Sequence, residues 1–246
     1  MLTTLTCIEI GVSTWNIWQI DQKGYIDAKS LPVSANTLDN SNAMAQLLNE
    51  RIGKKILFLL NTSHTIIKLS EESLPSQYLS YEKAGYILSH SNFLNKNANK
   101  RIWTSATPKF IPNNLVEMCR SKKIRIGRIK AIDTLDYRIT HYLSKLYDSV
   151  IWIFIPQEPG IRLIVLQDGI PINVYVFSNN LDFRYNELVR IWICQAFSPQ
   201  HAIVLSDNTD YDWIKLFLKE RSLEYLDKSS MDLKQDMVKE WVANEL

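Results

Sequence analysis

The chain has 246 residues, of which 46% are hydrophobic, so it is long enough to bury a sizeable core in one large domain or two smaller ones. Lys and Arg number 28 against 26 Asp and Glu, a formal net charge of +2, which gives no overall electrostatic reason to expect nucleic acid or a membrane as partner. No basic N-terminal region precedes a long apolar segment, and no run reaches the roughly 18 apolar residues of a membrane-spanning helix. These features predict a soluble, intracellular chain.

Cysteine and histidine usage does not indicate a metal site. The cysteines are odd in number and lie in apolar surroundings, so we expect buried thiols: Cys7, Cys119 and Cys194. The histidines are far apart, and none has an acid or a cysteine at ligand spacing: His64, His90, His141 and His201. We therefore predict no metal.

A pattern of three apolar runs separated by turn residues occurs twice. The second copy is clearer, with runs at Val150–Ile155, Ile161–Leu166 and Ile170–Phe177. Their Ile, Val, Trp and Phe content and the Pro and Gly residues between them predict a three-stranded antiparallel meander. Its first run is apolar at nearly every position, which indicates a strand near the middle of the sheet.

The first copy of the pattern comprises Leu5–Ile10, Thr14–Ile20 and Tyr25–Val33. Each meander precedes a predicted helix and a short strand, at Leu38–Arg51 and Ile56–Leu60 in the first copy and at Phe183–Phe197 and Ala202–Leu205 in the second. A duplication on this scale predicts two sheets covered by helices that face each other across a cleft. This is the plan of an α/β protein with two ribonuclease H-like subdomains, doubled as in actin.

We assign residues 1–147 to the first subdomain and residues 148–246 to the second, which ends in a helix. A small α+β segment is inserted in the first subdomain, at about residues 62–100. It should contain a strand at Thr65–Leu69, a helix from Ser80 to Phe93, and a mobile polar loop at Asn92–Lys100. After the insertion we expect strands at Arg101–Ser105 and Ile124–Ile132 and helices at Pro112–Arg120 and Asp133–Tyr147, with Asp133 as the helix cap.

Three segments carry a resemblance to a known family. Ile102–Leu143 has a strand ending in Ala and Pro, then a helix, a strand, and an acidic residue that opens the next helix. Ile56–Glu82 has a strand, a short turn, a second strand and a Leu-Pro entry into a helix, and Tyr185–Arg190 lies where the family has the helix after its second meander. In these features the chain resembles PilM and the type II secretion L proteins.

This resemblance implies an actin-like cytoplasmic protein of a type IV pilus or type II secretion inner-membrane platform. Its implied partners are the tail of a platform protein, the assembly or secretion ATPase, or further copies of itself. A C-terminal helix with Leu233, Met237 and Trp241 on one side lies where secretion L proteins precede a membrane span. PilM-type proteins are soluble instead, so the chain reaches the inner membrane either through partners or through a missing span.

An actin-type ATPase holds phosphates in two hairpin turns, one in each meander, where small residues let backbone N–H groups approach the anion. The first turn keeps a glycine, two hydroxyls and an acid where ATP-binding members have Asp: Glu9, Gly11, Ser13 and Thr14. The second turn has Glu158 and Gly160, but Pro156 and Pro159 remove donors and no Asp-x-Gly step follows the strand.

The adenine-side element would need a Gly-Gly step, whereas the chain has Ser206-Asp207-Asn208. We therefore predict a degenerate nucleotide site, no cofactor and a non-catalytic scaffold. Two alternatives remain: an actin-fold ATPase that binds magnesium-ATP, and an unrelated interaction module of ribonuclease H-like fold. A nuclease using Glu9, Asp133 and Asp136 is disfavoured, because a helix cap explains Asp133 without chemistry.

A scaffold needs a binding surface. The candidate partner-binding residues are aromatic and lie on the first half's strands or on the insertion: Trp15, Trp18, Tyr78, Tyr81 and Trp103. A basic run extends from Arg120 to Lys130. As a strand it would divide its cations between two faces, which favours a solvated sheet edge, and it has no aromatic residues to stack on nucleic acid.

Overall fold

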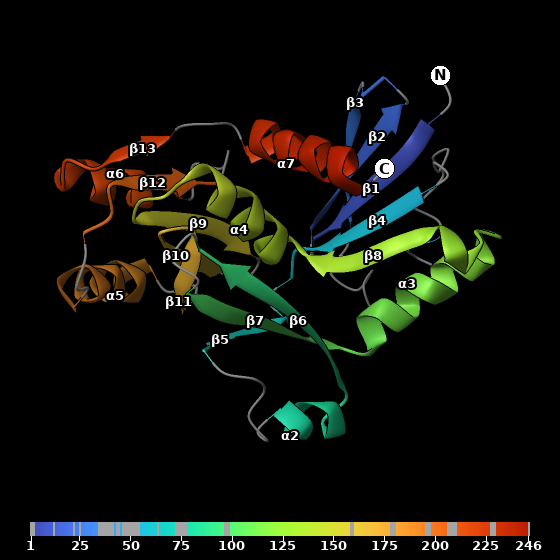
Figure 1. Ribbon diagram of the computed structural model, residues 1–246, viewed down its shortest axis with the longest axis horizontal. Helices are drawn as coiled ribbons and strands as arrows, with labels where there is room; N and C mark the ends of the chain where they lie inside the picture. The colour runs from blue at the N-terminus through green and yellow to red at the C-terminus, as the bar shows by residue number, and fades with distance from the viewer. Residues whose placement is uncertain are drawn as a thin grey trace.

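The duplicated meanders form two five-stranded sheets in the computed structural model (Figure 1). The structure describes residues 3–11, 13–21, 23–24, 26–33, 42, 45, 55–62, 64–71, 78–95, 99–157, 160–177, 181–194, 198–205, 211–226 and 230–245. The helix predicted at Leu38–Arg51 lies almost wholly outside these residues.

The first sheet has the order β3-β2-β1-β4-β8. Its strands are β1 (Thr3–Ile10), β2 (Thr14–Asp21), β3 (Ile26–Pro32), β4 (Lys55–Leu60) and β8 (Ile129–Thr134). The first three strands are antiparallel, whereas β4 and β8 run parallel to β1. On the outer face α3 (Phe110–Ser121) packs Ile111, Leu115 and Met118 against β1 and β4.

The second sheet repeats this arrangement in the order β11-β10-β9-β12-β13. Its strands are β9 (Ile151–Gln157), β10 (Gly160–Gln167), β11 (Ile170–Phe177), β12 (His201–Val204) and β13 (Glu224–Leu226). Two helices cover its outer face, α5 (Leu181–Cys194) and α6 (Asp212–Glu220). The predicted duplication is confirmed, and β9 lies in the centre of its sheet as its continuous apolar run indicated.

A third, three-stranded sheet is inserted in the first half and lies against β11 of the second sheet, with its helical end pointing away from both large sheets (Figure 1). It has the order β5-β7-β6, with β5 (Ile66–Ser70), β6 (Tyr86–Leu94) and β7 (Lys100–Pro108), and a short helix α2 (Tyr78–Lys83). β7 pairs only with strands of this sheet among the described residues, so the inserted unit continues past Lys100 to Pro108.

The prediction of a helix from Ser80 to Phe93 is wrong beyond Lys83. Gly85 has φ +88°, which ends the helix, and the chain then alternates side chains as the strand β6. The predicted loop at Asn92–Lys100 is also shorter in the structure, because Asn92–Leu94 and Lys100 lie in strands. Asn95 N donates to Asn99 O at 3.2 Å, which closes a hairpin.

The two halves share their inner helices. α4 (Leu135–Leu146) follows the first sheet but contacts β10 and β11 of the second, and α7 (Ser230–Glu245) follows the second sheet but places Lys234 against β1 of the first. The two helices also touch, with Lys145 Nζ 2.8 Å from Glu240 Oε1. Buried side chains of both helices and both sheets form one apolar cluster, so the halves are packed as a unit.

Two local predictions need correction. Thr134, not Asp133, caps α4, because its Oγ1 accepts from Tyr137 N at 3.3 Å, while Asp133 accepts from Arg138 Nε at 2.7 Å. The strand predicted at Ile124–Ile132 begins only at Ile129, after a single 3₁₀ turn at Ile126–Arg128. In the described part of the chain, no helix is both long and apolar enough to cross a bilayer.

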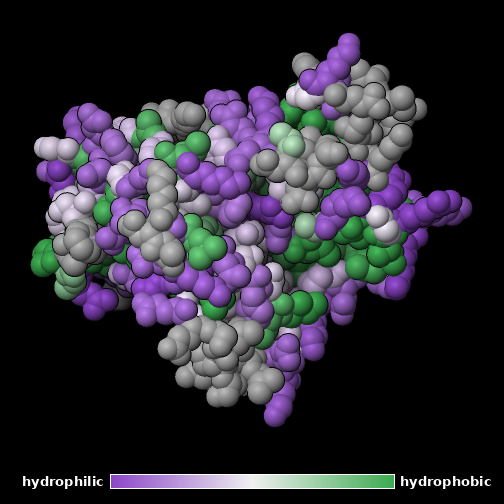
Figure 2. Space-filling model, in the orientation of Figure 1, coloured by the Kyte–Doolittle hydropathy of each residue, from purple (hydrophilic) through white to green (hydrophobic). Residues whose placement is uncertain are grey.

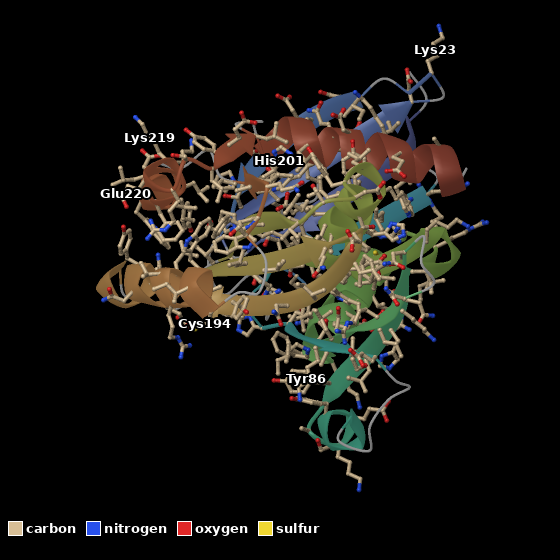
Figure 3. The ribbon with its side chains drawn as sticks, turned by 60° about the vertical axis from the view of Figure 1, so that its left-hand side comes forward. Lys23, Tyr86, Cys194, His201, Lys219 and Glu220 are labelled. Carbon is tan, nitrogen blue, oxygen red and sulfur yellow. The ribbon has the colours of Figure 1, made fainter. Side chains whose placement is uncertain are left out.

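The cysteines do not all lie in the core. Cys7 and Cys119 are buried, as predicted, but Cys194 is exposed near the end of α5 (Figure 3), because it lies on the helix side turned away from the second sheet. Burial raises the pKa of the Cys7 thiol and raises that of Cys119 to about 11. A thiol of raised pKa in a closed core is unreactive.

We expect one fast-reacting thiol per native chain. A thiol-specific chromogenic reagent should modify Cys194 quickly and the other two cysteines only after unfolding in urea. Cys194→Ser should remove the fast phase and leave the total in urea reduced by one. A second fast thiol in the native protein would contradict the burial of Cys7 and Cys119.

His141 makes the packing of α4 sensitive to acid. Its ring lies against Phe93 and Tyr137, and its pKa is lowered, first by burial and then by Lys145 and Arg138. A histidine with a lowered pKa stabilises the fold above its unfolded value of about 6.5, and this contribution is lost as the pH falls below that value. The free energy of unfolding of wild type should therefore fall more between pH 7.5 and 5.5 than that of His141→Gln. Equal losses would show that the ring is not responsible.

Candidate functional site

The inner faces of the two sheets become polar where the strands end. Along β1, Leu5 and Cys7 belong to the inner apolar cluster, and the next residue on that face is Glu9. Along β4, Leu57 and Leu59 point inward, and Asn61 follows. The carboxyl ends of parallel strands meet at one edge of a sheet, so these polar side chains come together between the halves, where α/β folds bind ligands.

Glu9 has its hydrogen-bonding capacity filled by side chains of this chain. Its Oε1 accepts from Asn61 Nδ2 at 2.8 Å, and its Oε2 accepts from Asn16 Nδ2 at 2.8 Å. Lys234 of α7 donates to both oxygens, at 2.9 and 3.0 Å. Ser30 Oγ donates to Asn16 Oδ1 at 2.6 Å, which fixes the orientation of that amide. The carboxylate is 2% exposed and the lysine side chain 9%, so the pair is shielded from water.

A second buried acid lies at the start of α4. Both oxygens of Asp136 accept from Gln157 Nε2, at 2.9 and 2.8 Å, and Oδ2 also accepts from Arg162 Nη1. Arg162 Nη2 donates to the backbone oxygen of Thr65 at 2.9 Å. Burial raises the pKa of the Asp136 carboxyl, whereas the Arg162 charge and the Gln157 amide act in the opposite direction. The aspartate and the arginine are almost completely buried.

Both ion pairs cross the boundary between the halves, with the same polarity. The second half supplies both cations: Lys234 reaches Glu9 on β1, and Arg162 on β10 reaches Asp136 on α4, the helix that leaves the first half. Removing one partner of a buried pair leaves an uncompensated charge, which costs about 3–5 kcal/mol. These two pairs, together with Asn16, Asn61 and Gln157, form a polar layer that connects the halves.

The first hairpin turn is closed on itself. Gly11 N donates to Thr14 O at 3.1 Å, and a Cβ at Gly11 would lie 2.6 Å from that oxygen. The glycine is thus required by the tight turn, and its N–H is already used. Ser13 O accepts from Val33 N at 2.8 Å, and the Thr14 side chain is exposed. Of the four residues predicted here, only Glu9 belongs to the buried polar layer.

The second turn also has a structural reason for its glycine. Gly160 has φ +140° and pairs with Gln157 across the β9–β10 hairpin, and a Cβ there would lie 2.5 Å from Phe177 O. Pro156 lies within β9 and offers no N–H. Glu158 lies outside the described residues. The donor that points into the polar layer from this turn is the Gln157 side chain.

Three of the predicted partner-binding aromatics cannot form a surface. Trp15 and Trp18 are 0% exposed and Trp103 is 1% exposed, because each lies on a strand face covered by helices or by the other half. The Tyr81 ring is half-buried on α2, with Lys68 Nζ 5.1 Å from its centroid. The side chain of Tyr78 lies outside the described residues.

The residues that sequence reasoning missed are those that meet the two acids: Asn16, Asn61, Gln157, Arg162 and Lys234. The alternation of side chains along the strands gives a signal for Asn16, Asn61 and Gln157, because each is the polar residue at the end of a series of inward-facing apolar residues. The set considered for a nuclease is divided among three cations: Glu9 with Lys234, Asp133 with Arg138, and Asp136 with Arg162. Within the described ranges, no three His, Cys, Asp or Glu residues gather in a group that could hold a metal ion.

No protein-family model and no curated sequence matches the chain. Among solved structures, a Bacteroides thetaiotaomicron protein with an actin-like ATPase fold and unknown function has a TM-score of 0.70 at 11% identity, with 96% of each chain covered. The PilM-PilN type IV pilus biogenesis complex gives 0.62 at 13% identity, covering 92% of this chain and 88% of that one.

The cytoplasmic domain of EpsL, an inner-membrane component of the type II secretion system of Vibrio cholerae, gives a TM-score of 0.55 at 6% identity, covering 98% of this chain and 96% of that one. The predicted α/β, actin-like architecture is confirmed. In fold, the chain resembles PilM and the EpsL cytoplasmic domain, as its sequence indicated.

The buried Glu9–Lys234 pair should show strong coupling in a double-mutant cycle. Lys234→Met leaves a buried carboxylate and Glu9→Gln leaves a buried ammonium, so each should lower the free energy of unfolding by about 3–5 kcal/mol. The double variant should lose clearly less than the sum of the two, with a coupling of about 1–3 kcal/mol. Urea denaturation provides the measurement.

The matched control is the ion pair between Lys145 and Glu240 on α4 and α7, whose side chains are 44% and 31% exposed. Lys145→Met should cost about 1 kcal/mol or less, because water screens that pair. Additive losses for the two residues of the buried pair would mean that they do not stabilise each other.

Proposed function

We propose that the chain is a non-catalytic scaffold of a type IV pilus or type II secretion inner-membrane assembly platform, which holds the tail of a platform protein, the assembly ATPase, or both. One observation supports the non-catalytic part of the proposal: the Lys234 ammonium donates hydrogen bonds to both carboxylate oxygens of Glu9. An ATPase of this fold needs that acid to act on a magnesium ion or its water, and a cation already bound there opposes the binding of a second one.

The turns support the same proposal. A phosphate cradle needs backbone N–H groups that point into the cleft, but Gly11 N–H closes its own turn and Pro156 has none. The glycines of the two turns, Gly11 and Gly160, do not face open space, because a Cβ added at either one would meet a backbone oxygen. The assignment to a pilus or secretion platform is supported by the fold shared with PilM and EpsL.

Because the Glu9–Lys234 and Asp136–Arg162 pairs occupy the boundary between the halves, we place the partner segment at the outer edge of the second sheet. β13 is the last strand in that sheet's order, and beside it lies a cavity of about 490 Å³ lined by Tyr147, His201, Leu223, Glu224, Tyr225 and Leu226. An extended peptide that adds to a strand edge gains backbone hydrogen bonds, and a neighbouring apolar hollow accepts one of its side chains.

The purified chain should not hydrolyse magnesium-ATP, and its thermal midpoint should not rise when the nucleotide is added. Both follow from the cation on Glu9. A steady rate that disappears in Glu9→Ala would favour the ATPase alternative. A midpoint increase without turnover would make ATP a structural ligand and remove the main support for a degenerate site.

Partner binding can be tested with the cytoplasmic tail of an inner-membrane platform protein and with the N-terminal domain of the assembly ATPase from the same organism. We expect at least one to bind with a dissociation constant on the order of tens of micromolar or tighter. If neither binds, the scaffold proposal fails and the fold alone remains.

The place of binding has its own test. Leu226→Asp puts a charge at the hollow beside β13 and should weaken tail binding at least about tenfold. Leu216→Asp is the matched control, because Leu216 is an exposed leucine on α6 that does not line the hollow. Equal effects of the two substitutions, or none from Leu226→Asp, would place the partner elsewhere.

A further inference from the structure

The segment between α3 and β8 is not a strand but a rigid turn that presents cations. Lys123 has φ 56°, and its backbone N donates to Arg120 O at 2.9 Å. Ile124 N donates to Cys119 O at 2.8 Å. This pair of bonds is a Schellman end, normally made with glycine at the position of Lys123. Ile124 is 7% exposed and anchors the turn in the core beside Cys119.

The second half offers an internal comparison. There α6 ends in the same way, with Ser222 at φ 53° and Leu223 N bonded to Leu218 O at 3.0 Å, and β13 begins at the next residue. In the first half the four residues Arg125-Ile126-Gly127-Arg128 intervene between Ile124 and β8. Since the second half connects helix to strand without such residues, the fold does not require them.

The added residues combine charge with an exposed apolar side chain. Ile126 is 46% exposed at the start of the 3₁₀ turn, and a Cβ at Gly127 would meet nothing within 4 Å. Lys123, Arg125 and Lys130 are exposed around them. We call this surface the basic end, and it comprises Lys122, Lys123, Arg125, Ile126, Arg128 and Lys130.

The local sequence of the basic end contains several cations and no acid. No acidic residue occurs between Met118 and Ile132, and the nearest one before it, Glu117, is paired with Arg120. The whole chain has a net charge of only +2, so this end is far more basic than the average surface. Figure 2 shows hydrophilic side chains protruding from the right-hand edge of the molecule, where α3 ends and β8 begins in Figure 1.

We infer that the basic end binds the surface of an anionic lipid bilayer directly. Lys and Arg side chains are attracted to acidic headgroups, and an isoleucine held at the tip of a rigid turn can enter the interface between headgroups and acyl chains. Nucleic acid fits less well, because the surface has no aromatic residue on which bases would stack. An acidic peptide would not need the exposed isoleucine at the centre of the charges.

The position of the basic end makes this role separable from the polar layer. Ile129 pairs with Ile56 at the start of β4, and Leu5 at the start of β1 pairs with Lys55. The basic end therefore lies at the amino ends of the parallel strands, whereas Glu9 lies at the carboxyl end of β1. Substitutions at one end should leave the other intact.

The test is co-sedimentation of the full chain with vesicles of phosphatidylcholine alone or with about one third phosphatidylglycerol. Wild type should sediment with the anionic vesicles only, and binding should fall steeply as salt is added. The variant K123G/R125Q/K130Q should bind on the order of a hundredfold more weakly, since each cation contributes about fivefold. Glycine at position 123 suits the positive φ, so this variant should fold.

The matched control is K83Q/K100Q/K219Q, which removes three exposed lysines away from the basic end, one of them on α6 (Figure 3). It should keep binding within about threefold, and Ile126→Ser should weaken binding several-fold. Thermal unfolding of each variant confirms its fold.

Three results would overturn the inference: equal binding to neutral vesicles, equal losses in the two triple variants, or no binding to anionic vesicles. A labelled single-stranded oligonucleotide and an acidic peptide are the competing ligands. If either bound more tightly than anionic vesicles and lost binding in K123G/R125Q/K130Q, the surface would belong to that ligand instead.

Discussion

The relation of the two halves depends on charges that cannot reach water. Glu9 ends an inward-facing apolar series on β1 and Asp136 lies in the first turn of α4, and each acid is compensated by a cation from the other half. In a low-dielectric interior an unpaired charge costs more than a net hydrogen bond contributes, so both pairs must form together with the packing of α4 and α7. A hinge motion that separated the halves would leave four charged groups exposed or without their ion-pair partners. Hinge motion of the halves around a ligand is therefore opposed by these two buried ion pairs.

The duplication makes the divergence of the two halves visible. Each half has a meander, an outer helix ending in a left-handed residue, a short strand and an inner helix that contacts the opposite sheet. The halves differ in the charges that they bring to the shared boundary, since both cations belong to the second. Identical halves could also pair opposite charges, because a self-complementary boundary places residue i of one copy against residue j of the other. In this chain the charges are divided instead, with the acids in the first half and the cations in the second.

Local patterns predicted the strands well and the polar layer poorly, for a physical reason. The meanders follow from alternation, β-branched residues and turn residues, all of which act within a few positions. The partner of Glu9 lies 225 residues away, and no local rule connects them. The apolar neighbours of Cys194 predict a position in the core, yet its side chain is exposed at the last residue of α5. The alternating apolar residues before Ile129 predict a strand, yet Ile124 anchors the end of α3 in the core and Ile126 is exposed.

The two ends of the first sheet therefore differ in what holds them in place. At the carboxyl ends of the strands the charged groups are buried, form ion pairs and connect to the second half, so a substitution of Glu9 or Lys234 affects the packing of α7. At the amino ends the cations lie around a turn anchored by Ile124, whose buried side chain packs within the first half. Substituting the cations of the turn leaves the packing between the halves unchanged, whereas substituting Glu9 or Lys234 disrupts that packing. The charge of the exposed turn can therefore differ without any change in the packing between the halves.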